Sequence, residues 1–290
     1  MNGILIINKS AGMTSFDVVA KLRKILEIKK IGHGGTLDPM ATGVLPIFIG
    51  KATKIINIIQ DQDKEYIASF ELGIQTDTQD ITGSVIKKKE SFESVDNIKN
   101  ILNNFTGQIN QVPPMFSAIK INGKRLYDLA RQGKEIQRDA RKINIYNISL
   151  LSFDPKSQTG SIKTKVSKGT YIRTLINDIG IQLGCGATMT SLVRTKALNF
   201  DIKNSYSLDE IKKLKQEKKI NNILLNSEQA LKSLPEIFLE NDIINKLSNG
   251  VKIKVNTPVF LYYRVYNKSG VFLGIGYTKQ DSFFKLKNII

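Results

Sequence analysis

The pattern of apolar and polar residues along the chain first predicts strands. Residues 3–7 form a continuous apolar run, which is typical of a buried strand. In residues 66–72 every second side chain is apolar, and residues 161–167 alternate in the same way. An apolar run also follows at 44–49. These segments predict several half-buried or buried strands in the first two thirds of the chain.

Apolar side chains spaced three and four residues apart predict helices between these strands. We expect one helix capped by Ser15, a second capped by Ser94 and a third that opens at Thr170 and ends at Gly184. Strands and helices mix without a regular βαβ rhythm. The expected fold class is therefore α+β, with a mixed or antiparallel central sheet and flanking helices.

The last third of the chain has a different texture. A lysine-rich helix is expected at 207–219, and after Pro235 come a short helix at 241–247 and strands at 259–265 and 271–277. Asn267-Lys268-Ser269-Gly270 between those strands is a hairpin signal. We predict a large domain over residues 1–234 and a small β-rich domain over 235–290.

Composition narrows the class of protein. The 290 residues carry a formal charge of +17, which favours a polyanionic partner such as nucleic acid. The chain is also rich in Lys, Ile and Asn, which A/T-rich codons encode, so charge alone leaves that partner open. We expect no membrane span and no secretory signal, and hence a cytoplasmic protein. With one His and one Cys, at Cys185, no disulfide and no usual zinc site is expected, and Cys185 is interpreted as packing.

Residues 32–46, GHGGTLDPMATGVLP, place Asp38 in a glycine-rich turn five residues after the only histidine, His33. The apolar run at 44–49 would anchor that turn to a buried strand. The spacing of Gly43 and Gly50 excludes a P-loop, and Leu37 stands where a dinucleotide fingerprint needs glycine. On these grounds alone, a solvated turn aspartate remains the alternative to a catalytic one.

The same segment resembles the catalytic motif of the bacterial TruB family of tRNA pseudouridine-55 synthases. The family pattern His-x-Gly-Thr-Leu-Asp-Pro-x-Ala-x-Gly-Val-Leu is matched at every fixed position. The resemblance continues at residues 8–15, 63–68, 168–174 and 191–195 and so covers most of residues 3–200. Asn8 and Ser10 depart from the pattern. The resemblance implies a pseudouridine synthase fold and an isomerase that converts the T-loop uridine at tRNA position 55, as a monomer, with no cofactor and no metal.

The resemblance also implies catalytic roles. Asp38 would act as an ionised carboxylate, either as nucleophile or as base towards a ribose proton, and both routes remain open. Arg173 would pair with Asp38, and Tyr66 would stack on the uracil. Tyr66 could otherwise be a half-buried strand tyrosine, and Arg173 a surface residue of an ordinary capped helix.

Supporting positions follow from the same motifs. Tyr171 and Leu192 would wall the pocket, although Leu192 could equally be a core leucine. His33 would fill the gap left by the flipped base, or else be a structural histidine. Lys9 would support the site, with a solvated loop lysine as the alternative.

RNA contacts are expected mainly from a thumb-like segment at about 117–141 that would close over the T stem-loop of tRNA. An unpartnered cationic helix is the alternative there. By position, residues 235–290 resemble a short PUA-type RNA-binding domain. The candidate RNA-binding residues are Lys120, Lys124, Arg125, Tyr127, Arg131, Arg138, Arg141 and Lys168.

Two other functions remain as alternatives. One is a related synthase that takes its targets from a guide RNA within a multi-protein particle. The other is a non-catalytic tRNA-binding or folding factor, for which Asp38 would be dispensable.

Overall fold

The computed structural model describes residues 1–59, 63–121, 123–258, 261–278 and 283–288. Within them, a nine-stranded sheet runs in the order β1-β3-β12-β4-β11-β10-β7, with β2 paired to β3 and β13 to β12. All neighbours are antiparallel except β12 and β3. The strands are β1 (Gly3–Lys9), β2 (Ile31–His33), β3 (Thr42–Ile49), β4 (Lys64–Leu72), β7 (Gly107–Gln111), β10 (Arg141–Asp154), β11 (Thr159–Val166), β12 (Ala187–Ala197) and β13 (Phe200–Asp201).

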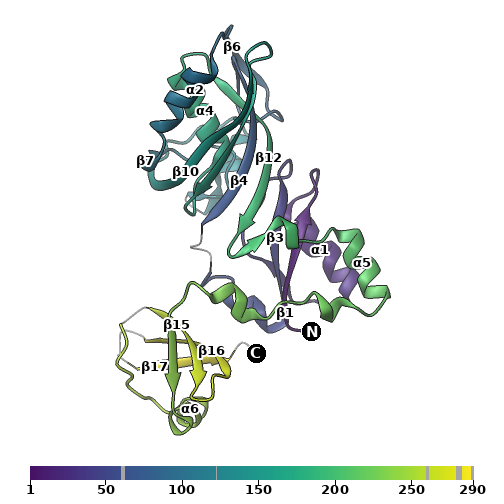
Figure 1. Cartoon of the computed structure of the whole chain (residues 1–290), viewed down its shortest axis with the longest axis vertical. Helices are drawn as coiled ribbons and strands as arrows, with labels where there is room; N and C mark the ends of the chain where they lie inside the picture. The colour runs from purple at the N-terminus through teal and green to yellow at the C-terminus, as the bar shows by residue number, and fades with distance from the viewer. Residues whose placement is uncertain (60–62, 122, 259–260, 279–282, 289–290) are drawn as a thin grey trace.

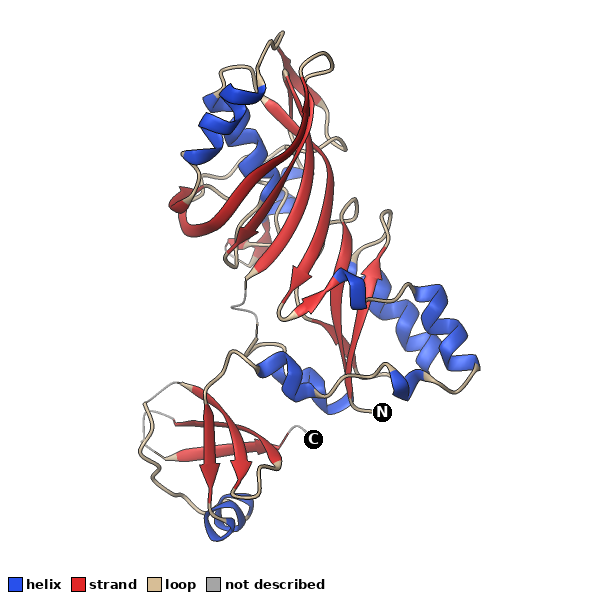
Figure 2. Cartoon of the chain, in the orientation of Figure 1, coloured by secondary structure: helices blue, strands red, loops and turns tan. Residues whose placement is uncertain are grey.

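Helices flank this sheet, which confirms the expected mixed α+β class (Figure 1). Apolar side chains of α1, α2, α4 and α5 join those of β1, β3, β4 and β12 in one continuous core. Two of the helices accompany the β1–β3 half of the sheet and two the β4–β10 half (Figures 1 and 2). The helices are α1 (Ser15–Leu26), α2 (Val95–Asn103), α3 (Leu126–Ala130), α4 (Ile172–Gln182) and α5 (Leu208–Gln216), with 3₁₀ turns η1 (Gly50–Ile55), η2 (Ile202–Asn204), η3 (Ile220–Asn222) and η4 (Ser227–Leu231).

The opposite face of β1 and β3 is buried too. Ile4, Ile6 and Phe48 pack there with η1 and η4 and with Tyr266 and Phe272 of the C-terminal sheet. That second sheet has the order β14-β15-β16-β17. The C-terminal elements are β14 (Glu236–Leu239), α6 (Asn241–Ser248), β15 (Tyr262–Asn267), β16 (Phe272–Thr278) and β17 (Phe284–Asn288).

The hairpin expected at 267–270 is confirmed between β15 and β16. Asn267 accepts a hydrogen bond from the amide of Val271, and Gly270 has a φ of 80°. The strand expected at 259–265 lies partly outside the described residues. Two small hairpins, β5 (Ile74–Thr76) with β6 (Val85–Lys88) and β8 (Lys120–Ile121) with β9 (Lys124–Arg125), complete the chain.

Two of the expected helix starts are wrong by one residue. Thr14, not Ser15, caps α1, because Thr14 forms a capping box with Asp17. Ser15 Oγ instead accepts from the amide of Leu37 at 2.8 Å. Ser94 is confirmed as the cap of α2.

Helix α4 does not open at Thr170. Tyr171 is its N-cap residue, and the hydroxyl of Thr170 donates to the carbonyl of Ser167 at 3.0 Å. This hydrogen bond closes the turn before the helix, which is the other common use of a threonine side chain.

No helix in the described part of the chain combines the length and apolar character needed to cross a bilayer.

Candidate active site

The loop between β2 and β3 carries Asp38, and several hydrogen bonds fix its backbone. The amide of Gly34 donates to the carbonyl of Pro46 at 2.8 Å, and the amide of Ala41 donates to the carbonyl of Asp38 at 3.0 Å. Leu37 is buried and held by Ser15 at the start of α1. The aspartate that the sequence placed in a glycine-rich turn therefore sits on a rigid loop.

Arg194 on β12 holds the two ends of this loop. Its side chain is fully buried, and Nε donates to the carbonyl of Val44 at 2.8 Å. The two Nη atoms donate to the carbonyls of Thr36 at 3.1 Å and Gly35 at 3.2 Å. Gly43 has a φ of 100°, and a Cβ there would lie 2.3 Å from the carbonyl oxygen of Arg194. Only glycine allows the strand and the loop to approach this closely.

Lys9 supports the other side of the loop. Its side chain is buried, which excludes the solvated-lysine alternative, and Nζ donates to the carbonyls of Met13 at 2.8 Å and Pro39 at 3.2 Å. Burial lowers the pKa of Lys9 to about 8, although the negative charge of Asp38 opposes this shift. The ammonium group is therefore placed beside the residue that follows Asp38.

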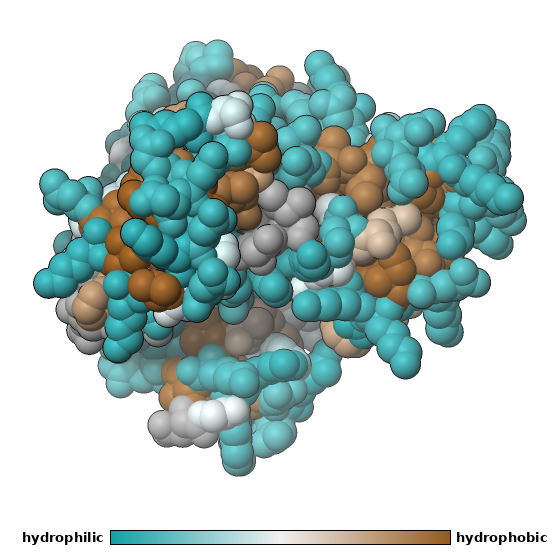
Figure 3. Space-filling view, turned by 90° about the horizontal axis from the view of Figure 1, so that it is seen from below, coloured by the Kyte–Doolittle hydropathy of each residue, from teal (hydrophilic) through white to brown (hydrophobic). Residues whose placement is uncertain are grey.

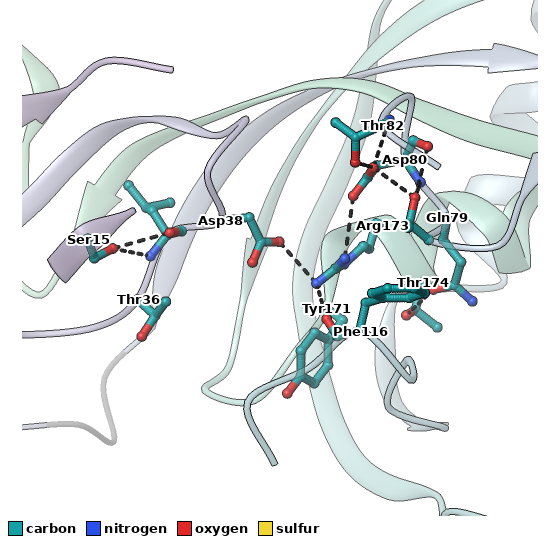
Figure 4. Close-up of polar contacts among 12 residues, drawn as sticks. Ser15, Thr36, Asp38, Gln79, Asp80, Thr82, Phe116, Tyr171, Arg173 and Thr174 are labelled. Atoms are coloured by element: carbon teal, nitrogen blue, oxygen red, sulfur yellow. Dashed lines mark hydrogen bonds and ion pairs between the residues drawn. The ribbon is translucent and has the colours of Figure 1, made fainter. Parts of the chain in front are cut away.

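Arg173, near the start of α4, faces Asp38 across the site (Figure 4). Nη2 lies 3.2 Å from Asp38 Oδ2 and donates to the carbonyl of Phe116 at 2.7 Å. The expected ion pair is thus present. The two side chains differ in exposure, because 37% of the Asp38 side chain is exposed against 7% of Arg173. The Asp38 carboxylate is thus open to solvent, while Arg173 is buried and held by the carbonyl of Phe116.

Asp80 is a site residue that sequence reasoning missed. Its Oδ2 lies 3.4 Å from Nη1 of Arg173, and its side chain is 5% exposed. Oδ1 accepts from the amide of Thr82 at 3.0 Å and from the hydroxyl of Thr78 at 2.9 Å (Figure 4). The only sequence signal is a threonine two residues to either side of the aspartate, at Thr78 and Thr82, which is equally typical of an exposed turn.

Tyr66 and Leu192 lie on the face of the sheet that carries the loop. In the register of the strands, Tyr66 on β4 stands opposite Arg194, which in turn stands opposite Gly43 on β3. Two strand spacings place the Cα of Tyr66 roughly 10 Å from that of Gly43. Leu192 is two residues before Arg194 and shares its face. Tyr66 and Leu192 are both 7% exposed.

Tyr171 and His33 border the same region. The side chain of Gln111 holds the backbone of Tyr171, accepting from its amide at 2.8 Å and donating to its carbonyl at 3.1 Å. Burial raises the pKa of the Tyr171 hydroxyl. Burial also lowers the pKa of His33, and the charge of Arg194 adds to the effect. These shifts favour a neutral phenol and a neutral imidazole.

The thumb-like segment contains β8, β9 and α3, and Asn122 within it lies outside the described residues. The guanidinium carbons of Arg125 and Arg131 lie 5.6 and 5.5 Å from the ring centre of Tyr127. Arg138 is partly covered and lies 3.6 Å from Glu135. The exposed cations of this region are Lys120, Lys124, Arg125, Arg131, Lys134, Arg141 and, in the turn before α4, Lys168. Among the described residues, no ion pair joins one of these exposed cations to Asp38, whose ion-pair partner is Arg173.

Among the described residues, no group of three or more His, Cys, Asp or Glu side chains is arranged to hold a metal ion. The absence of a metal and of a cofactor stays a prediction.

Family models define the class of this protein as a pseudouridine synthase. Residues 23–172 match the N-terminal domain of the TruB family pseudouridylate synthases, and residues 173–232 match the tRNA pseudouridylate synthase B C-terminal domain. The chain therefore belongs to the TruB family, and it is an isomerase.

Relatives with the name tRNA pseudouridine synthase B match the chain over nearly its whole length. A tRNA pseudouridine synthase B from Clostridium tetani is 44% identical over 299 aligned positions, which cover 100% of both chains. The protein of the same name from Clostridium kluyveri is 45% identical and covers 99% of each. In fold, the chain is similar to a crystal structure of a Cbf5–Nop10–Gar1 complex, with a TM-score of 0.77, 24% identity and coverage of 99% of this chain and 85% of the other. The resemblance found in the sequence is confirmed.

Proposed function

We propose that this chain converts the T-loop uridine at tRNA position 55 to pseudouridine, with Asp38 as the catalytic carboxylate. The observation that carries the proposal is the pairing of Asp38 with Arg173 on a rigid loop whose carboxylate is still partly exposed. The names of the full-length relatives support tRNA as the substrate.

The reaction rearranges atoms within one nucleotide. The C1′–N1 bond breaks, the uracil turns, and C5 bonds to C1′, after which C5 loses a proton and N1 gains one. No oxidant, reductant or water is consumed. Asp38 acts either by attacking the nucleotide or by removing a ribose proton, and both require an ionised carboxylate. Arg173 Nη2 lies 3.2 Å from Asp38 Oδ2 and holds the carboxylate in a fixed orientation.

The second task of the site is to keep the detached uracil in place. Tyr66 would stack on the base, and Tyr171 and Leu192 would wall the pocket, so that water does not capture the intermediate. The target uridine leaves its stack at a cost of a few kcal/mol. A neutral His33 ring filling the vacated gap would offset part of this, since stacking contributes roughly 1–3 kcal/mol per base.

RNA would be held by the thumb-like segment, where phosphate contacts fix position and the shape of the T loop supplies selectivity. The C-terminal sheet, within the PUA-like domain proposed for residues 235–290, would add a second contact, and residues 1–234 would form the catalytic domain. The enzyme would act in the cytoplasm as a monomer.

Substitution of the aspartate tests the catalytic assignment. Asp38→Ala is expected to abolish pseudouridine formation while tRNA affinity changes by less than tenfold, or about 1.4 kcal/mol. Both are measured on a bare tRNA transcript, by mapping pseudouridine along the RNA and by filter binding. Asp38→Asn, which keeps the size but removes the charge, should be equally inactive. Wild-type turnover in either variant would mean that another group does the chemistry.

A guide-RNA-dependent synthase is the second candidate, because the fold is similar to that of the Cbf5–Nop10–Gar1 complex. The identity of 44% over the full length to a protein named tRNA pseudouridine synthase B, against 24% to the Cbf5–Nop10–Gar1 structure, favours the first candidate. The two differ in one simple measurement. If purified protein modifies a bare transcript at position 55 and nowhere else, no guide RNA is needed.

A further inference from the structure

Helices α1 and α5 form a lobe beside the β1–β3 half of the large sheet (Figure 1). Lys215 near the end of α5 lies 3.4 Å from Glu27, the residue that follows α1. The C-terminal ends of the two helices are therefore close together. In the view from below, this lobe stays on the right of the molecule, and its outer edge is lined by hydrophilic side chains (Figure 3).

The outer surface of this lobe carries an excess of positive charge. Among the described residues, five exposed lysines on it form no ion pair, and we call them the α1/α5 surface: Lys21, Lys24, Lys212, Lys213 and Lys218.

Acidic side chains in the lobe do not balance these lysines. Asp17 and Glu210 close the capping boxes at the starts of α1 and α5. Glu27 pairs with Lys215, and Glu217 lies 2.9 Å from Lys219. Asp209 is a fifth acid, exposed in the first turn of α5 one turn before Lys212 and Lys213. Eight cations against these five acids leave residues 15–27 and 207–219 with a net charge of +3.

Helix stability explains only part of the pattern. Cations in a last turn interact favourably with the helix dipole, which accounts for Lys24 and Lys213. Lys21 and Lys212 lie before the last turn, and Lys218 lies beyond the end of α5. Closely spaced lysines repel one another, and a polyanion removes that repulsion.

The position of the surface indicates which polyanion it binds. Helix α1 starts at the catalytic loop, where Ser15 holds Leu37, and its twelve residues extend about 18 Å from there. An RNA whose T loop reaches Asp38 continues from the loop into the rest of the tRNA. We propose that the α1/α5 surface binds backbone phosphates of the substrate tRNA outside the T stem-loop. This inference rests on the proposed function.

Salt dependence of binding tests the proposal. The variant carries Lys24→Gln, Lys212→Gln, Lys213→Gln and Lys218→Gln together, and thermal melting checks that it folds. Its affinity is measured from about 50 to 200 mM salt for a full-length tRNA transcript and for an isolated T stem-loop hairpin. Each lost phosphate contact reduces the slope of log K against log salt by about 0.7–0.9. We expect the slope for full-length tRNA to fall by about 3 units, for four lost contacts, and the slope for the hairpin to stay unchanged.

A matched control removes the same charge elsewhere. Lys87, Lys88, Lys99 and Lys156 are exposed on β6, on α2 and in the turn after β10, away from the α1/α5 lobe (Figure 1). Their combined change to Gln should leave both slopes at the wild-type value.

Two results would overturn the inference. One is a wild-type slope for full-length tRNA in the α1/α5 variant, and the other is an equal loss for both RNAs. Failure of the proposed function looks different, because wild-type protein would then form no pseudouridine in either RNA.

Discussion

Asp80→Asn tests whether the carboxylate behind Arg173 is needed for catalysis. The substitution keeps the size of the side chain and an oxygen for the hydrogen bonds from Thr78 and Thr82. It removes the negative charge 3.4 Å from Nη1 of Arg173. Without that charge, the guanidinium loses one of the groups that fix its orientation towards Asp38.

The size of the effect follows from the distance. Two unit charges at this separation interact by about 5 kcal/mol at an effective dielectric constant of 20, and breaking a buried pair destabilises by roughly 3–5 kcal/mol. Part of this appears as lower stability. If about 3 kcal/mol is lost in the transition state, turnover falls by roughly a hundredfold. Affinity for tRNA should change little, because Asp80 is 3% exposed and cannot contact RNA directly.

Single-turnover pseudouridine formation with enzyme in excess measures the chemical step, and filter binding measures tRNA affinity. Asp77→Asn is the matched control: it makes the same change in the same hairpin, at an exposed residue that accepts from the amide of Ser84 and does not touch Arg173. That variant should turn over at the wild-type rate. Asp80→Asn turnover within threefold of wild type, at unchanged folding, would refute the positioning role.

Three further changes test the fixed loop. Arg194→Lys cannot keep all three hydrogen bonds to the carbonyls of the loop. Single-turnover assays should show a rate loss of about a hundredfold, because small misplacements of catalytic groups have effects of that size. Unchanged turnover would show that the loop keeps its conformation without Arg194. Gly43→Ala should lower the urea midpoint strongly, because its Cβ would clash with the carbonyl of Arg194, and a stable, active variant would contradict the close approach. The pKa of Lys9 is about 8 in the folded protein, below its value in the unfolded chain. Above pH 8 the unfolded chain therefore binds more protons than the folded protein. The contribution of Lys9 to the free energy of unfolding consequently increases as the pH rises. Between pH 7.5 and 9.5 the stability of wild type relative to Lys9→Met should therefore rise by about 2 kcal/mol in urea titrations, and a constant difference would rule out the lowered pKa.

Elements with local signals were predicted from the sequence. The cap at Ser94 and the alternation in β4 depend on neighbouring residues alone, and the structure confirms both. The fourteen residues of β10 were not predicted as a strand, because several of its apolar side chains, such as Leu151, are exposed and the alternation is poor. Pairing with β11 and β7, which no local pattern encodes, defines it.

The candidate site divides in the same way. Asp38 and Arg173 lie in motifs that can be read from the sequence, and their ion pair is present. Asp80 could not be found, because only the packing of the β5–β6 hairpin against β12 buries it. Arg194 lies two residues after Leu192, which the sequence analysis assigned to the pocket, yet the hydrogen-bond partners of Arg194 lie about 150 residues earlier in the chain. Tertiary contacts, which no short window contains, set these two roles.

The hydrogen bonds from Arg194 also imply that the catalytic loop is fixed late during synthesis of the chain. Residues 33–45 leave the ribosome early, while β12, which fixes them, begins only at Ala187. Contacts between segments so far apart in sequence form late, since the intervening chain must first be closed into a loop. A nascent chain that ends before Ala187 already contains the entire aspartate motif but not the strand that holds it in shape. Competence for the reaction should therefore appear abruptly, when the last strands of the large sheet have joined it.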